Sequence, residues 1–139
     1  MSKQIDEETL KKLVAFQQAE LDGVVTYQKL EELTDDIQLK EVFRKTAADE
    51  GRHAAILRSY TGAELTPDSA PAQQLAAGLK TMDMPTLLEG ISKGEYAGYD
   101  MYAPYIQDFP LLKDIMADER KHGQIMAEEA ARLRTNPAG

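Results

Sequence analysis

Apolar residues recur at every third or fourth position along most of the chain, which is the period of an amphipathic α-helix. Four such stripes predict four helices, near residues 6–33, 36–60, 85–106 and 110–134. Pro85 suits the first turn of the third helix, whereas Pro104 should kink or end that helix early. No segment shows the alternation of apolar and polar residues that is typical of a half-buried β-strand, so the predicted fold class is all-α.

The connections between these helices differ in length. The two outer connections are short, so the first two helices and the last two should each form an antiparallel hairpin. The middle connection, residues 61–84, is marked by Pro, Gly and Ser, and a short helix is expected near 71–80. A connection of this length can cross a helix of about 25 residues, roughly 38 Å long. We therefore predict one domain over residues 1–139, a four-helix bundle of two hairpins joined by a crossover.

The two halves of the chain repeat each other. Three residues of the first stripe recur 75 positions later in the third stripe; the matched pairs are Glu20 and Glu95, Gly23 and Gly98, Tyr27 and Tyr102. The phrase Ala-Asp-Glu-x-basic-His of residues 48–53 recurs 69 positions later, at 117–122. Each hairpin therefore supplies one glutamate from its first helix and a Glu-x-x-His from its second. The only two histidines of the chain stand in these phrases.

Acidic residues lie on the apolar faces of all four helices. The polar residues on these stripes are Glu20, Glu50, His53, Glu95, Glu119 and His122. A Glu and a His three positions apart share one face of a helix, and ionised carboxylates in a core are costly unless they are compensated. The neighbouring basic residues fall beside or opposite the stripes, so they cannot pair with these acids. Two divalent cations would balance four glutamates, and a mixture of carboxylate and imidazole suits iron or manganese, with zinc as a further occupant.

A single Glu-x-x-His has a simpler interpretation, as a surface acid beside a structural histidine. Two copies, each with an additional glutamate on the apolar stripe of the partner helix, favour a carboxylate-bridged dimetal site instead. The pattern therefore predicts two metal ions bound by the six residues.

Composition narrows the classes of function without selecting one. The formal net charge of −8 argues against a general nucleic-acid binder, which needs a basic face. The sequence has no cysteine, which excludes disulfides and thiolate metal sites. The N-terminus is polar, and no apolar run approaches the roughly 20 residues that span a bilayer. We expect a cytoplasmic protein with neither nucleic acid nor membrane as a partner.

The duplicated ligand pattern resembles the ferritin-like superfamily, and within it the diiron domain of rubrerythrins. The resemblance extends over essentially the whole chain, including the stretch GEYAGYDMY of the third predicted helix. It implies that Glu20 and Glu95 are terminal ligands, that Glu50 and Glu119 bridge two irons, and that each histidine binds one iron. Many rubrerythrins carry a further glutamate where this chain has Gly98, so its two metal positions should be more symmetric.

The resemblance also implies partners for the ligands. Asp49 should hydrogen-bond His122, and Asp118 should hydrogen-bond His53, with simple surface exposure of both aspartates as the alternative. The hydroxyls of Tyr27 and Tyr102 are candidates to bond ligand carboxylates and to take part in catalysis, unless both rings only fill the core. Glycine is unfavourable inside a helix, so the repeated pair Gly23 and Gly98 needs a reason. The two glycines could leave space for a small oxidant or allow close helix packing, and the sequence does not decide between these explanations.

The expected function is that of a rubrerythrin-like oxidoreductase, a non-haem diiron protein that reacts with hydrogen peroxide or dioxygen in oxidative stress. The alternative is a ferritin-like ferroxidase that stores or handles iron, and a third possibility is a metal-stabilised bundle without turnover. Because the sequence has no cysteine-ligated rubredoxin centre, electrons should come from a separate donor. A homodimer is expected.

Overall fold

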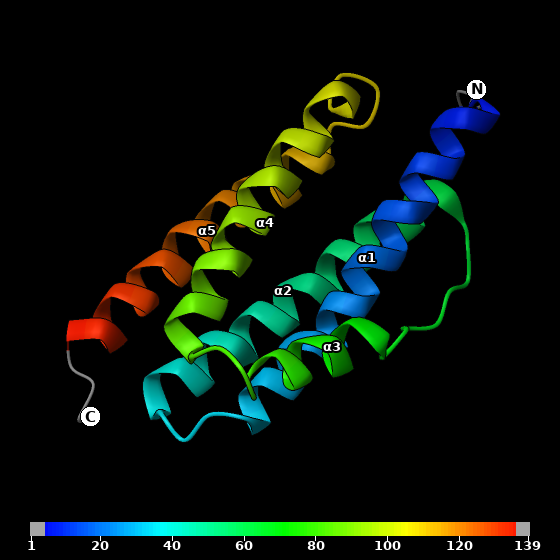
Figure 1. Cartoon of the computed structure of the whole chain (residues 1–139). Helices are drawn as coiled ribbons and strands as arrows, with labels where there is room; N and C mark the ends of the chain where they lie inside the picture. The colour runs from blue at the N-terminus through cyan, green and yellow to red at the C-terminus, as the bar shows by residue number, and fades with distance from the viewer. Residues whose placement is uncertain (1–4, 136–139) are drawn as a thin grey trace.

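The structure, a computed structural model, describes residues 5–135 of the chain, and these residues form helices and their connections (Figure 1). The elements are α1 (Glu7–Glu32), α2 (Ile37–Thr61), α3 (Ala70–Gly78), α4 (Met84–Tyr102), the 3₁₀-helix η1 (Ala103–Tyr105) and α5 (Leu112–Thr135). The all-α prediction is confirmed for this part of the chain. Within the same residues, no helix is both long enough and apolar enough to cross a membrane.

Short polar side chains define where the long helices begin. Asp6, Asp36 and Asp83 precede α1, α2 and α4, and each carboxylate accepts a hydrogen bond from the backbone N–H three residues later. Such a cap satisfies one of the backbone donors that a helix leaves free at its first turn. At its other end α2 stops at Gly62, whose φ of 65° is left-handed and therefore favours glycine.

The third predicted helix ends earlier than residue 106. Regular α-helix stops at Tyr102, and the next three residues, which include Pro104, form η1 instead. Proline has no N–H to continue the α-helical ladder, which is why the sequence favoured an early end here. The short helix expected near 71–80 is α3, at residues 70–78.

The four long helices form a bundle of two hairpins. α1 packs along α2, and α4 packs along α5. The connection from α2 to α4 runs back along the bundle, so that α4 is antiparallel to α1, and α3 lies against α1 on the way (Figure 1). The two hairpins meet chiefly where α2 packs against α5. The predicted bundle with its long crossover is confirmed.

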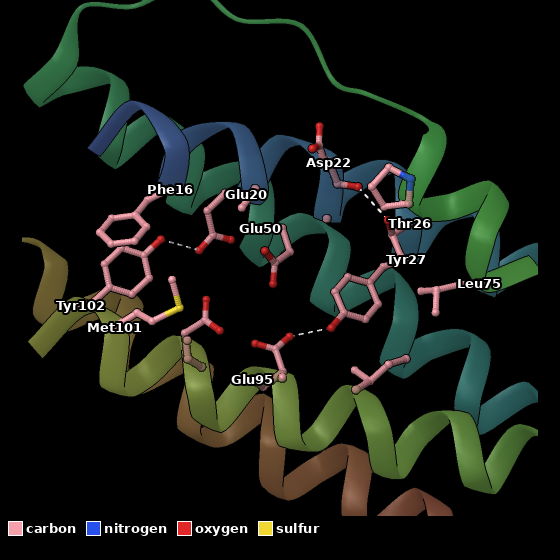
Figure 2. Close-up of a pocket in the computed structure, with 17 residues that line it drawn as sticks. Phe16, Glu20, Asp22, Thr26, Tyr27, Glu50, Leu75, Glu95, Met101 and Tyr102 are labelled. Atoms are coloured by element: carbon pink, nitrogen blue, oxygen red, sulfur yellow. Dashed lines mark hydrogen bonds between the residues drawn. The ribbon is translucent and has the colours of Figure 1, made fainter. Parts of the chain in front are cut away.

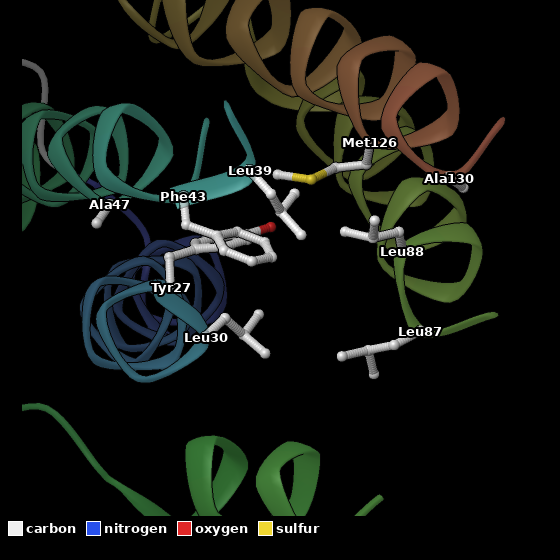
Figure 3. Packing of buried hydrophobic residues seen from close by; sticks show 9 residues of the cluster. All are labelled: Tyr27, Leu30, Leu39, Phe43, Ala47, Leu87, Leu88, Met126 and Ala130. Atoms are coloured by element: carbon white, nitrogen blue, oxygen red, sulfur yellow. The ribbon is translucent and has the colours of Figure 1, made fainter. Parts of the chain in front are cut away.

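Two apolar clusters lie at opposite ends of this bundle. One contains Leu30, Phe43, Leu88 and Met126, at the end of the bundle where the chain turns from α1 into α2 (Figure 3). The other contains residues from the opposite ends of the same helices, among them Leu13, Leu57, Tyr102 and Ile115. Burial of these side chains supplies the hydrophobic stabilisation of the fold. The polar residues of the duplicated motifs lie between the two clusters.

Candidate metal centre

The structure brings the six predicted ligands together in the middle of the bundle. They form two overlapping groups, one of Glu20, Glu50, His53 and Glu119 and the other of Glu50, Glu95 and His122. Within each group, one oxygen or nitrogen atom of every residue lies within 4.8 Å of the others. All six side chains are buried. Glu50 belongs to both groups, whereas Glu119 belongs only to the first.

Each long helix contributes to this cluster because its apolar stripe faces the bundle axis. Three residues on a helix advance it by almost one turn, so the Glu and the His of each motif point toward the same place. The internal repeat makes the arrangement approximately two-fold symmetric. The α1–α2 hairpin supplies Glu20 and Glu50 with His53, and the α4–α5 hairpin supplies the matching three residues.

The two histidines are held in the same way, each by an aspartate of the other hairpin. His53 Nε2 lies 2.7 Å from Asp118 Oδ2, and His122 Nε2 lies 2.8 Å from Asp49 Oδ2. These are the two hydrogen bonds that the sequence resemblance implied. An acceptor on Nε2 fixes the orientation of the imidazole and directs Nδ1 toward the opposite side of the ring.

Both Nδ1 atoms are buried and make no hydrogen bond to any residue that the structure describes. His53 Nδ1 lies 3.4 Å from Glu20 Oε1, and His122 Nδ1 lies 3.7 Å from Glu95 Oε1. A buried nitrogen without a hydrogen bond is unfavourable, and these two face carboxylate oxygens at distances that leave them incompletely satisfied. A metal ion between imidazole and carboxylate would satisfy both, so the residues present fit a bound metal.

The crowded carboxyl groups differ in their affinity for protons. Burial, followed by the proximity of Glu20, raises the pKa of Glu50 well above its usual range. Burial and the neighbouring Glu95 raise the pKa of Glu119 in the same way. Burial alone would also raise the pKa of Glu20 and of Glu95, but contacts with a protonated glutamate and a histidine outweigh it and lower both. Without metal, protons therefore carry the compensating charge that divalent cations would supply.

Two tyrosines hold the carboxylates of α1 and α4 from across the bundle. The Tyr27 hydroxyl donates to Glu95 Oε1 at 2.5 Å, and the Tyr102 hydroxyl donates to Glu20 Oε1 at 3.1 Å (Figure 2). Burial and the nearby glutamates raise the pKa of both phenols, so they remain protonated donors. Each tyrosine thus acts on the hairpin opposite to its own, a pairing that the sequence did not specify.

The paired glycines of α1 and α4 provide clearance for carboxylates. A Cβ atom at Gly23 would lie 2.9 Å from Glu50 Oε2, and one at Gly98 would lie 2.8 Å from Glu119 Oε2. Such contacts are too short for ordinary packing. Both glycines also line the cavity between α1 and α4, so space for a small oxidant beside them stays a prediction. Close helix packing, the other explanation, agrees with these contacts, because they are made with side chains of α2 and α5, the hairpin partners of α1 and α4.

Arg52 is a polar neighbour of the cluster that sequence reasoning missed. Its guanidinium contacts Asp118 Oδ2 and lies 3.3 Å from Asp49 Oδ1, so it connects the two aspartates that hold the histidines. Its place beside the apolar stripe indicated only a solvated residue. The repeat could have shown that Lys121 occupies the equivalent position, 69 residues later, but not that Arg52 reaches across to α5.

A cavity of about 470 Å³ opens between α1 and α4 and reaches the carboxylates (Figure 2). All four glutamates of the cluster contribute to its lining, and Pro71 and Leu75 of α3 form part of its wall. The paired glycines Gly23 and Gly98, which line this cavity, indicated a need for space, but its size depends on the separation of the two helices. It provides a route by which small molecules can reach the cluster from solvent.

Comparison with known proteins agrees with the pattern of the site. A family model described as Rubrerythrin matches residues 13–130, which include all six residues of the cluster and both aspartates. No curated protein and no solved structure gave a significant match.

Proposed function

Because the chain belongs to the rubrerythrin family, we propose that it holds two metal ions at the central cluster and reduces hydrogen peroxide or dioxygen. Iron is the proposed occupant, since the mixed carboxylate and imidazole donors suit iron, and manganese or zinc could occupy the same donors. The ligands in this proposal are Glu20, Glu50, His53, Glu95, Glu119 and His122.

The observation that carries the proposal is the pair of buried Nδ1 atoms without hydrogen bonds. Each belongs to a histidine whose other nitrogen is already bound to an aspartate, and each faces a glutamate oxygen. A structural histidine in a core would use both nitrogens for hydrogen bonds. An imidazole oriented by a carboxylate, with its second nitrogen free, is the usual environment of a metal ligand.

The two groups of residues suggest the role of each carboxylate. Glu50 contributes to both groups, which supports a bridging position between two ions. We assign the same role to Glu119 by the internal two-fold symmetry, and a terminal position to Glu20 and Glu95. The tyrosine hydrogen bonds support this assignment, because they orient the terminal carboxylates and leave Glu50 and Glu119 to face the ions.

Two ferrous ions, when bound, would supply two electrons to an O–O bond, and reduction of peroxide to two waters consumes two protons. The residues of the chain prepare the site for this reaction. Tyr27 and Tyr102 keep their protons and hold the carboxylates of Glu95 and Glu20 by hydrogen bonds, and the two protons that the reaction consumes would come from water. The cavity between α1 and α4 admits the oxidant, and the apolar clusters at both ends exclude water from the other sides.

The electrons that restore the reduced site would come from a separate donor, and we propose that the protein acts as a cytoplasmic homodimer. The given sequence contains no cysteine to hold a thiolate-bound iron centre, which is why we propose a separate donor. A dimer can be tested by sedimentation equilibrium of the metal-loaded protein, where a cage of many subunits would favour iron storage instead.

Stopped-flow oxidation of the diferrous protein tests the reaction. We expect hydrogen peroxide to oxidise the loaded protein faster than dioxygen does, with both irons retained. Faster oxidation by dioxygen, followed by release or mineralisation of iron, would replace the proposal with ferroxidase activity. No reaction with either oxidant would leave only a metal-stabilised bundle.

A further inference from the structure

We propose that the cavity between α1 and α4 is a binding site for a neutral, mostly apolar organic molecule. This inference goes beyond the reaction with a small oxidant. Hydrogen peroxide needs roughly the space of two waters, about 60 Å³. The cavity measures about 470 Å³, which lies in the range of sites for organic ligands.

The walls of the cavity are mostly apolar, and its acidic groups other than Asp22 belong to the glutamate cluster. Phe16, Ile91 and Met101 line it from α1 and α4, and Leu75 lines it from α3. The carboxylates of Glu20, Glu50, Glu95 and Glu119 also line it, and Figure 2 shows three of them pointing toward one another between the helices. A large apolar pocket with a few convergent polar groups is the usual form of a small-molecule site. The occupant would place one end against the carboxylate cluster and its apolar remainder between the two helices.

The charges of the lining indicate a neutral occupant. The ionisable side chains of the lining that could carry charge near neutral pH are all acidic, namely Asp22 and the four glutamates. Asp22 Oδ1 already accepts hydrogen bonds from Gln18 Nε2 at 2.9 Å and from the backbone N–H of Asp68 at 2.7 Å. An anionic group in this lining would meet no basic partner. With the two divalent cations of the proposed function bound, the four glutamates would be balanced, and a cationic group would meet no uncompensated charge there.

The dimensions favour a small molecule over a segment of another chain. One turn of an α-helix with its side chains is about 10–12 Å across and 5.4 Å long, and occupies about 420–610 Å³. The cavity therefore has the volume of about one turn, too little for a helix of several turns. Pro71 and Leu75 of α3 also line the cavity.

Two glycines of α4 provide a matched test. Gly94 lines the cavity, Gly90 does not, and a Cβ atom at either position would meet no other atom within 4 Å. We would load the full chain with zinc, which has no redox chemistry. We would then titrate it with the neutral fluorescent probe N-phenyl-1-naphthylamine, comparing Gly94→Leu, Gly90→Leu and the unchanged chain. The probe should bind saturably, and Gly94→Leu should weaken it at least about tenfold, whereas Gly90→Leu should change it less than about twofold.

Competition defines the ligand class. We expect 1-decanol to displace the probe and decyltrimethylammonium, which cannot coordinate zinc, to be at least about tenfold weaker. Absence of saturable binding, equal effects of the two glycine variants, or equal displacement by both ligands would each overturn the proposal. Zinc content of the same samples tests the metal site separately. Fewer than two zinc ions per chain with retained, Gly94-sensitive binding would contradict the metal site while supporting the cavity.

Discussion

Substitution of Gly23 or Gly98 by alanine should separate metal affinity from folding stability. Each added methyl group would lie 2.9 or 2.8 Å from a carboxylate oxygen of Glu50 or Glu119. Ordinary contacts of a Cβ atom begin near 3.4 Å. The oxygen must therefore move by about half an ångström, whereas metal–ligand distances tolerate only about 0.2 Å.

The two substitutions should lower metal affinity without lowering the stability of the metal-free protein. A displaced bridging ligand should weaken metal binding at least about tenfold, or about 1.4 kcal/mol per tenfold. Without metal, the carboxylate is the free end of a flexible side chain and can turn away. Alanine is also favoured over glycine in a helix by about 1 kcal/mol. The melting temperature of the metal-free variants should consequently stay level or rise while metal affinity falls.

Competition against a fluorescent zinc chelator measures the affinity, and thermal unfolding with and without metal measures the stability. Gly90→Ala is the control, because a Cβ atom there meets nothing and only the helix preference changes. Gly90→Ala should raise the melting temperature and leave metal affinity unchanged. If Gly23→Ala and Gly98→Ala bind two metals as tightly as the unchanged chain, the clearance for Glu50 and Glu119 has no role in holding the ions.

Three further predictions address the surroundings of the ligands. Tyr27→Phe should lower the free energy of unfolding by about 1–3 kcal/mol, because it leaves buried Glu95 without its donor; urea unfolding measures this, and an unchanged midpoint would contradict it. Asp118→Asn should weaken metal binding about 10- to 100-fold through His53, while Asp114→Asn, on the exposed side of α5, should have no effect in the same chelator assay. The metal-free protein should lose stability as pH rises above about 4.5, since the raised pKa values of Glu50 and Glu119 mean that the folded state binds more protons than the unfolded state. Urea unfolding in the presence of a chelator would refute this last point if stability rose from pH 5 to pH 8.

The sequence predicted those features that depend on one helix at a time. The period of the apolar stripes places Glu50 and His53 on one buried face, and the repeat then identifies the equivalent pair in the other half. Features that depend on the distance between the two hairpins could not be predicted from the sequence. Tyr27 shares a stripe with Glu20, yet its hydroxyl bonds Glu95 of the opposite hairpin.

The reason for the glycines illustrates the same limit. Helix propensity indicated that Gly23 and Gly98 needed an explanation, but only the relative position of α1 and α2, or of α4 and α5, shows which atoms fill the space. The cavity between α1 and α4 likewise follows from the separation of two helices, so Gly23 and Gly98 could indicate a need for space but not its size or its apolar walls.

Anomalous diffraction from crystals of the iron-loaded protein, recorded at the iron absorption edge, tests the central claim most directly. We predict two peaks per chain, each about 2.0–2.2 Å from a histidine nitrogen as for other metal–imidazole bonds. One peak should adjoin His53 Nδ1 and the other His122 Nδ1, with the Glu50 carboxylate between them. A single peak, no peak, or metal bound at Nε2 in place of Asp49 and Asp118 would contradict the dimetal centre.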